Sequence, residues 1–148
     1  MDGVKPIKPS LPQLKAVRAA EHAQCVVCSS HNPLGLGIEF ILADDGSIQG
    51  SFSGSHIFTG YPGLLHGGVI AALLDGAMTN CLFAHGLVAV TAELKVRYRH
   101  PVVADKPVVI RAWTQKSLPP LHLLQAELQQ NGRIKATATA KFMERQEL

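Results

Sequence analysis

The 148-residue chain is 47% hydrophobic and 17% charged, and its formal net charge is +3 at pH 7. Low charge and high apolar content exclude a disordered chain. A chain of this length buries roughly 68–70% of its unfolded surface, enough for one domain without disulfides or a structural metal. With 5% aromatic residues, the composition does not indicate a nucleic-acid-binding surface, which needs clustered Lys/Arg and stacking rings.

The N-terminal part is predicted to contain one short helix. Residues 1–10 are expected to form a flexible lead-in. Ser10 is a candidate N-cap, and Pro12 falls in the first turn of a helix that extends to about His22. Residues 25–33 are predicted as a loop.

Two strands are expected next. Apolar residues alternate through residues 34–42, which is the period of a strand. Asp44-Asp45-Gly46 supplies a hairpin turn, and residues 47–53 return as the second strand. The alternating apolar positions are Leu34, Leu36, Ile38, Phe40 and Leu42.

One long helix is predicted over residues 66–84, after an irregular Gly/Pro-rich stretch at 54–65, and it ends at His85-Gly86. Its apolar stripe has helical spacing, and the flank beside the stripe is made of small residues that allow another backbone or a slender ligand to approach. The stripe is Ile70, Leu73, Leu74, Ala77, Met78, Cys81 and Leu82; the flank is Gly68, Ala71, Ala72, Asp75, Gly76 and Thr79.

Four strands complete the chain, at residues 87–100, 106–116, 121–130 and 133–143. Asn131-Gly132 between the last two is a strong two-residue hairpin signal. The order is therefore two strands, one helix and four strands. It predicts a long antiparallel sheet with one helix on one face.

The start of the long helix, Leu65-His66-Gly67-Gly68 with Asp75 further along, resembles the central helix of the PaaI-like hotdog thioesterases. In that family HGG is followed by an Asp at this distance. Three other stretches are similar to the same family and occur in the same order. They are Cys25-x-x-Cys28 through Asn32-Pro33-x-Gly35-Leu36, Thr91-Ala92-Glu93-Leu94 leading to Tyr98-Arg99-His100-Pro101, and Gly132-Arg133 to Phe142.

The resemblance implies an α+β fold: a single hotdog domain at residues 25–148, with a long antiparallel sheet wrapped around one central helix, preceded by a lead-in and short helix at 1–24. It also implies hydrolysis of acyl-CoA thioesters, with no cofactor beyond the coenzyme A of the substrate. The expected assembly is a homodimer or homotetramer with composite active sites.

Asp75 is the candidate catalytic carboxylate. An ionised carboxylate is costly to bury in an apolar helix, and a broken local rule in a consistent segment often marks function. Capping or exposure to water would equally explain the residue; the resemblance favours catalysis. Asp75 would activate a water or attack the thioester directly to give a mixed anhydride.

Gly67 at the helix start is the candidate oxyanion donor, because N–H groups there lack intrahelical acceptors. Gly67 and Asp75 lie about 12 Å apart along one helix, too far to serve one thioester. A two-fold dimer solves this when the helix start of one subunit faces Asp75 of the other.

Two further residues are catalytic candidates. Thr91 matches a position where some relatives carry a Ser or Thr that orients the nucleophilic water, although an ordinary β-branched strand residue is an equal reading. His66 either hydrogen-bonds across the site or organises the helix start, and we favour the second role. Some relatives carry an Asn at the position of Gly60, so that side chain is absent here.

The substrate-binding candidates are Gly68, Gly60, Tyr61 and Phe58 near the helix start, and Arg97 and Arg99 on one strand face. Phe58 and Tyr61 are expected to line the acyl or pantetheine channel. Arg97 and Arg99, with Lys95, either contact the phosphates of coenzyme A or form an ordinary solvated face.

A metal is not expected. His22, Cys25, Cys28 and His31 all have zinc-binding side chains. However, structural sites usually draw two ligand pairs from separated segments, so we assign these residues to loop packing and predict no metal.

Two other functions remain open. A hotdog dehydratase or hydratase would pair a His with an acid on the central helix, and residues 56–62 faintly resemble that family. His56 lies further from Asp75 than that family's spacing allows. A non-catalytic acyl-CoA-binding module is the other alternative, since one fold supports many functions.

The expected location is cytoplasmic, with no membrane partner. The N-terminus shows no apolar signal core, and the apolar stretch at 69–84 is interrupted and short for a bilayer. Three cysteines do not form a secreted disulfide framework.

Overall fold

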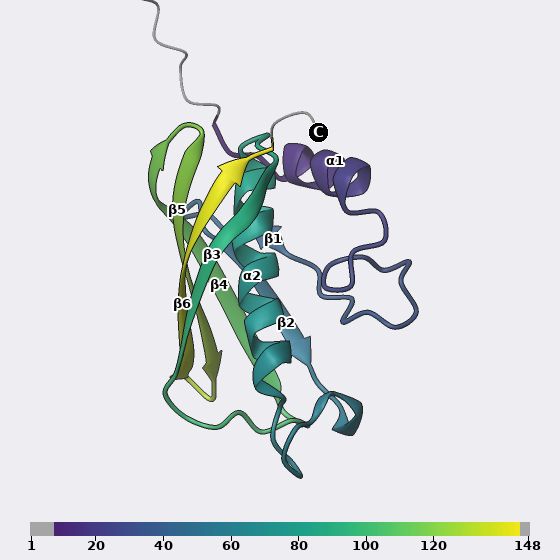
Figure 1. The fold of residues 1–148 in the computed structure, drawn as a ribbon. Coiled ribbons are helices and arrows are strands. Elements are labelled where there is room, and N and C mark those ends of the chain that lie inside the picture. The colour runs from purple at the N-terminus through teal and green to yellow at the C-terminus, as the bar shows by residue number, and fades with distance from the viewer. Residues whose placement is uncertain (1–7, 146–148) are drawn as a thin grey trace, which may run out of the picture.

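A computed structural model describes residues 8–145, so the first part of the predicted lead-in, residues 1–7, lies outside the described residues. A six-stranded sheet curves around one long helix, and a second helix packs at one end (Figure 1). In chain order the elements are α1 (Leu11–Glu21), β1 (Ile41–Leu42), β2 (Ile48–Ser53), the 3-10 turn η1 (His56–Phe58), α2 (Gly67–Ala84), β3 (Ala89–Tyr98), β4 (Pro107–Leu118), β5 (Leu121–Gln130) and β6 (Arg133–Glu144).

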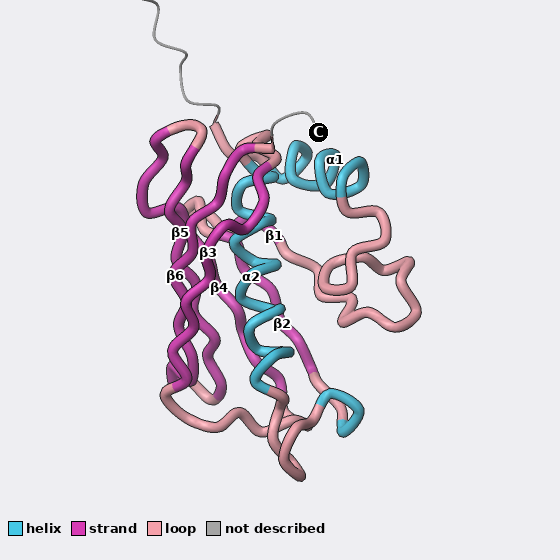
Figure 2. The backbone as a smooth tube through the Cα atoms, in the orientation of Figure 1, coloured by secondary structure: helices cyan, strands magenta, loops and turns pink. Residues whose placement is uncertain are grey.

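The sheet has the order β1-β2-β4-β5-β6-β3, and every neighbouring pair is antiparallel. Figure 2 shows α2 running along one face of this sheet, with the loops gathered at its two ends and beside α1. The predicted α+β hotdog architecture, a long antiparallel sheet wrapped around one central helix, is confirmed.

The long helix begins and ends at the residues that the sequence indicates. His66 is its N-cap, and Gly86 follows its end with φ +72°, a left-handed conformation that suits glycine. By length and composition α2 resembles a membrane-spanning helix, but 67% of it is buried inside the protein. It is the core helix, and Leu73, Leu74, Ala77 and Met78 are fully buried against the sheet.

The central strands alternate between the core and the outer face. Along β5 each second residue is buried, and Leu124 and Leu128 are completely inaccessible. The Asn131-Gly132 turn that joins β5 to β6 has positive φ at both residues, as a tight hairpin requires. Burial of one face and the hairpin geometry together set the strand register.

The strand predicted at residues 34–42 is wrong over most of its length, because only Ile41 and Leu42 join the sheet. The backbone before them pairs elsewhere: the N–H groups of Leu36 and Ile38 donate to carbonyl oxygens of the preceding loop at 2.7 and 3.0 Å. Leu34 is 85% exposed, while Phe40 is fully buried. The alternating apolar residues therefore reflect partial burial of an extended segment that pairs with the preceding loop and not with a strand.

The short N-terminal helix is confirmed. Ser10 caps it by accepting a hydrogen bond from the Gln13 N–H at 3.2 Å. Leu14 projects from it into the core and is completely buried, and Arg18 donates to the Phe40 carbonyl oxygen at 3.2 Å. These contacts attach α1 to the central helix and to the segment before β1.

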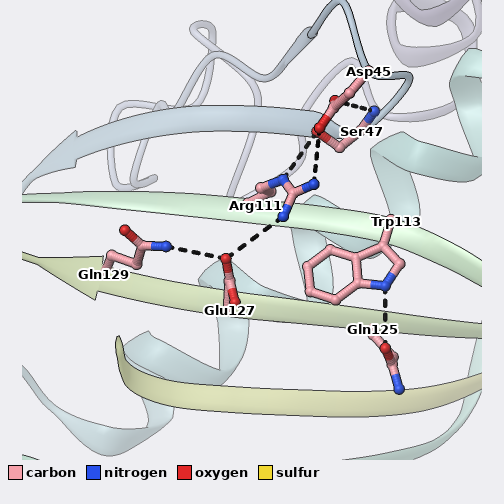
Figure 3. Close-up of polar contacts among 7 residues, drawn as sticks. All are labelled: Asp45, Ser47, Arg111, Trp113, Gln125, Glu127 and Gln129. Atoms are coloured by element: carbon pink, nitrogen blue, oxygen red, sulfur yellow. Dashed lines mark hydrogen bonds and ion pairs between the residues drawn. The ribbon is translucent and has the colours of Figure 1, made fainter. Parts of the chain in front are cut away.

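The outer face of the sheet carries a polar network instead of a second apolar layer (Figure 3). Arg111 on β4 pairs with Asp45 at 2.8 Å and approaches Glu127 on β5 at 3.8 Å. Hydrogen bonds from Ser47, followed by the one from Arg111, lower the pKa of Asp45 to about 2. Trp113 lies beside the Arg111 guanidinium at 5.0 Å. The polar side chains on this face hydrogen-bond to one another, and the apolar core lies on the opposite face, against α2.

Candidate active site

Asp75 lies midway along α2, and its side chain turns toward β3. The Thr91 hydroxyl donates to Asp75 Oδ1 at 2.6 Å. The rest of the α2 surface around Asp75 is apolar or small, and the next three residues of the helix are buried. The carboxylate is thus held at one point by a hydroxyl on the neighbouring strand.

Burial of the Asp75 carboxyl raises its pKa above the ordinary value for aspartate, although the hydrogen bond from Thr91 acts in the opposite direction. The Cys25 thiolate raises the pKa further, and His22 lowers it. A raised pKa brings the carboxylate nearer to the basicity at which a general base works well around neutral pH.

A bulge in β3 makes the Asp75–Thr91 contact possible. The pairing of β3 with β6 skips Ala92, because Thr91 lies opposite Phe142 and Glu93 lies opposite Lys141. Strand side chains alternate between faces, so an unbulged strand would point Thr91 and Tyr98 to opposite sides. The extra residue re-aims Thr91 toward the helix, a common role of bulges near functional sites.

The start of α2 forms a second polar site. His66 Nδ1 accepts a hydrogen bond from the Gly68 N–H at 2.8 Å, so this ring nitrogen caps the helix and the Gly68 N–H is occupied. The Tyr98 hydroxyl donates to the Gly67 carbonyl oxygen at 2.7 Å. Within residues 8–145 the Gly67 N–H has no protein acceptor. Gly67 therefore presents the free donor that an oxyanion site requires.

A pocket of about 320 Å³ opens beside this helix start and is lined by Gly60, Tyr61, Leu65, His66 and Gly67. The glycine at 60 leaves room for the His66 ring, since a Cβ there would lie 3.2 Å from His66 Cδ2. Four of the candidate residues, Gly60, Tyr61, His66 and Gly67, are thus brought together. Phe58 is not among the lining residues; its ring packs against Phe52 at a centroid distance of 5.8 Å.

The basic residues of β3 lie on its other face. Tyr98 points toward the helix, so the alternating Lys95, Arg97 and Arg99 point away from it. They line a shallow pocket of about 180 Å³ with residues of β6. The structure therefore separates the basic residues from Gly67 within one protomer.

The two polar sites also remain separate within one chain. Thr91 with Asp75 marks one end of β3, and Tyr98 with Gly67 marks the other. β3 runs back along α2, so the sites are about 12 Å apart on the helix. Sequence reasoning did not assign a role to Tyr98, although it falls in one of the family-like stretches.

Comparisons with known proteins agree with this fold. Residues 62–117 match the family described as Thioesterase superfamily. An acyl-coenzyme A thioesterase, THEM4 of Bos taurus, is 33% identical over 85 residues, which is 55% of this chain and 35% of that protein. The crystal structure of a phenylacetic acid degradation-related protein from Ralstonia eutropha JMP134 has a TM-score of 0.66 and 26% sequence identity, over 73% of this chain and 85% of that one.

Over residues 62–117 the chain is similar to the thioesterase superfamily, and its fold is that of the PaaI-like hotdog proteins. The E. coli PaaI protein itself has the same fold, with a TM-score of 0.69 and 21% identity over 74% of this chain and 84% of that one. The chain spans about a third of the length of the bovine thioesterase that it matches. The matched family region holds Gly67, Asp75 and Thr91 together, so it includes both polar sites.

Proposed function

We propose that this PaaI-like protein hydrolyses acyl-CoA thioesters, with Asp75 as its catalytic carboxylate. The observation that carries the proposal is the Asp75 carboxylate itself, which is partly buried in the core helix, raised in pKa, and held by Thr91 beside an exposed strand. The likeness to an acyl-coenzyme A thioesterase supports the choice of substrate class.

The proposed active unit is a homodimer formed through β3. This ten-residue strand ends the sheet, and most of its residues are exposed on both faces in a single protomer. A long unpaired edge of this kind is a template for pairing with another chain. Antiparallel pairing with a second copy about a two-fold axis would place the Tyr98 end of one strand beside the Thr91 end of the other.

Such pairing would bring Gly67 of one protomer toward Asp75 of its partner. In the proposed reaction the Gly67 N–H hydrogen-bonds to the thioester carbonyl oxygen and stabilises its developing charge. Asp75 removes a proton from a water that attacks the carbonyl carbon, or it attacks the carbon itself to form a mixed anhydride that water then hydrolyses. The C–S bond breaks, and coenzyme A leaves as the thiol after it takes up a proton.

The substrate would extend from this centre in two directions. The pocket of Gly60, Tyr61 and His66 would receive the acyl chain or the pantetheine arm. The exposed Arg97 and Arg99 would contact the phosphates of coenzyme A by charge-assisted hydrogen bonds. Substituting both arginines by glutamine is expected to raise KM and leave kcat nearly unchanged.

The first experiment measures thiol release from short, long and aromatic acyl-CoAs. Wild type should turn over at least one class, and Asp75→Asn should bind the ester yet fail to cleave it. Asp105→Asn, a change at an exposed aspartate, is the matched control and should retain full activity. Binding without hydrolysis in wild type would instead favour an acyl-CoA-binding module. A change in enoyl absorbance without thiol release would favour a dehydratase.

The oxyanion donor is tested with Gly67→Pro, which removes one N–H. Proline suits the first position of a helix, and the extended backbone of His66, φ −61° and ψ 135°, accepts a following proline. Loss of one oxyanion donor typically lowers kcat by about 10²–10³-fold. Gly67→Ala is the control: it keeps the N–H, and its Cβ would lie 3.6 Å from the Tyr98 ring, an ordinary contact.

Mixing two inactive variants tests the composite site. A dimer of one Asp75→Asn chain and one Gly67→Pro chain has one doubly defective site and one intact site when the site is shared. Random exchange of subunits would then restore about a quarter of wild-type activity. If Asp75 and Gly67 acted within one chain, the mixture would show no recovery.

A further inference from the structure

His22, Cys25 and Cys28 form a cluster of possible metal ligands that is separate from the proposed catalytic residues, although Cys25 and His22 act electrostatically on Asp75. One ligand atom from each lies within 4.8 Å of the others, and Cys28 Sγ lies 3.7 Å from His22 Nδ1. Around a tetrahedral zinc, with Zn–S about 2.3 Å and Zn–N about 2.0–2.1 Å, sulfur and nitrogen ligands are about 3.5 Å apart. The observed spacing therefore leaves room for one ion bound by all three side chains.

The turn that carries the two cysteines is arranged around the Cys25 sulfur. The backbone N–H groups of Val27 and Cys28 donate to Cys25 Sγ at 3.3 and 3.4 Å. These bonds stabilise a thiolate, the form of cysteine that binds metals.

The third ligand comes from the end of α1. His22 is the C-cap of that helix, and its ring packs edge-on against Phe83 of α2 at a centroid distance of 4.8 Å. The helix ends at Glu21, so the chain reverses there and brings His22 over the cysteine turn. Sequence spacing alone could not show this reversal. We expected no metal because the candidate ligands do not form two pairs in separated segments.

The surrounding segment would gain stability from a cross-link. Residues 22–40 contain no helix or strand, yet Val27, Ile38 and Phe40 within them are buried against the core. Irregular segments longer than about 12–15 residues are uncommon in compact domains unless they are functional. A metal that joins the end of α1 to this segment would hold both on the central helix.

We propose that His22 Nδ1, Cys25 Sγ and Cys28 Sγ bind one zinc ion. Zinc is the divalent metal that suits a set of two thiolates and one imidazole. Its fourth position would be filled by water from the adjoining cavity of about 440 Å³, which His22 and Cys28 both line. The site lies apart from the 320 Å³ pocket at the start of α2 and shares no lining residue with it.

The test uses the full chain without a histidine tag. Elemental analysis of protein purified under reducing conditions should find about one zinc per chain. Zinc-free protein titrated with Co²⁺ should reach saturation at one equivalent, with thiolate-to-cobalt charge-transfer absorption and the visible bands of tetrahedral cobalt. Cys25→Ser and Cys28→Ser should each reduce bound zinc at least tenfold.

Cys81→Ser is the matched control, because Cys81 is a buried thiol that approaches the Thr114 hydroxyl at 3.5 Å and lies outside the cluster. It should keep full zinc and the full cobalt spectrum. Loss of metal from this variant equal to that from Cys25→Ser would overturn the proposal. The proposal is also overturned if the wild type, kept reduced, binds neither zinc nor cobalt. Isolation of the wild type without metal and with a Cys25–Cys28 disulfide would overturn it as well. The wild-type cobalt titration decides the matter even if a variant fails to fold.

Discussion

Replacing Thr91 by valine would test how the ionisation of the proposed catalytic carboxylate, Asp75, is controlled. The Thr91 hydroxyl donates to Asp75 Oδ1 at 2.6 Å. Valine is also β-branched and suits a strand, so the change removes the hydroxyl and leaves the backbone and the β3 bulge in place.

The magnitude follows from that one hydrogen bond. A bond to a charged group contributes about 1.5–3 kcal/mol, and the lower value applies because Thr91 is exposed to solvent. About 1.4 kcal/mol corresponds to a tenfold change in a protonation equilibrium. The bond favours the ionised carboxylate, so its loss raises the pKa of Asp75 further above its ordinary value.

The assay is kcat/KM for acyl-CoA hydrolysis as a function of pH. A base must be ionised to act, so activity falls as pH falls through the pKa of Asp75. Thr91→Val is expected to move this acidic limb to higher pH, with about tenfold lower activity on the limb and little change on the alkaline plateau. Thr91→Ser should behave as wild type.

Two other results would separate the possible roles of Thr91. An equal loss of activity at every pH would assign the hydroxyl to orienting the attacking water. An unchanged profile, or an acidic limb moved to lower pH, would refute the argument that this hydrogen bond stabilises the ionised Asp75.

Three further changes test the packing. Asp75→Asn should raise Tm at pH 8 by roughly 4 °C, or about 1 kcal/mol. Burial raises the pKa of Asp75 in the folded protein, so the ionised carboxylate destabilises the fold once the pH exceeds that pKa. Thermal melts should show the gain vanishing below about pH 4, where the unfolded chain is also protonated. Gly76→Ala should cost about 1–2 kcal/mol in urea unfolding, since its Cβ would lie 2.6 Å from Val27 Cγ1, and adding Val27→Ala should restore stability. Leu14→Ala, at a completely buried position, should cost about 2–5 kcal/mol in the same assay, with kcat per folded molecule unchanged.

Much of the fold could be predicted because its signals are local. The N-cap at Ser10, the stop at His85-Gly86 and the turn at Asn131-Gly132 act through residues near in sequence, and each appears where expected. The strand at residues 34–42 could not be excluded in this way. A strand needs a partner, and the backbone of that segment bonds to the cysteine loop instead.

The sequence predicted the residue types of the candidate site but only part of its geometry. His66, Gly67 and Asp75 could be singled out from one motif, and the helical rise led to the hypothesis that two subunits join Gly67 to Asp75. The bulge at Ala92 turns Thr91 toward Asp75, and it exists only in the pairing of β3 with β6. No feature of the sequence around residue 92 indicates a bulge.

By itself the sequence determined the central helix and the hairpins, since periodicity, caps and turn chemistry depend on neighbouring residues, and it singled out Asp75 as the candidate carboxylate. Only the tertiary structure decided which groups stay available. It occupies the Gly68 N–H with His66, leaves the Gly67 N–H without an acceptor among residues 8–145, and buries Asp75 enough to raise its pKa. It also folds His22 back onto Cys25 and Cys28. Burial and hydrogen-bond satisfaction depend on residues far apart in the chain, so a local pattern cannot specify them.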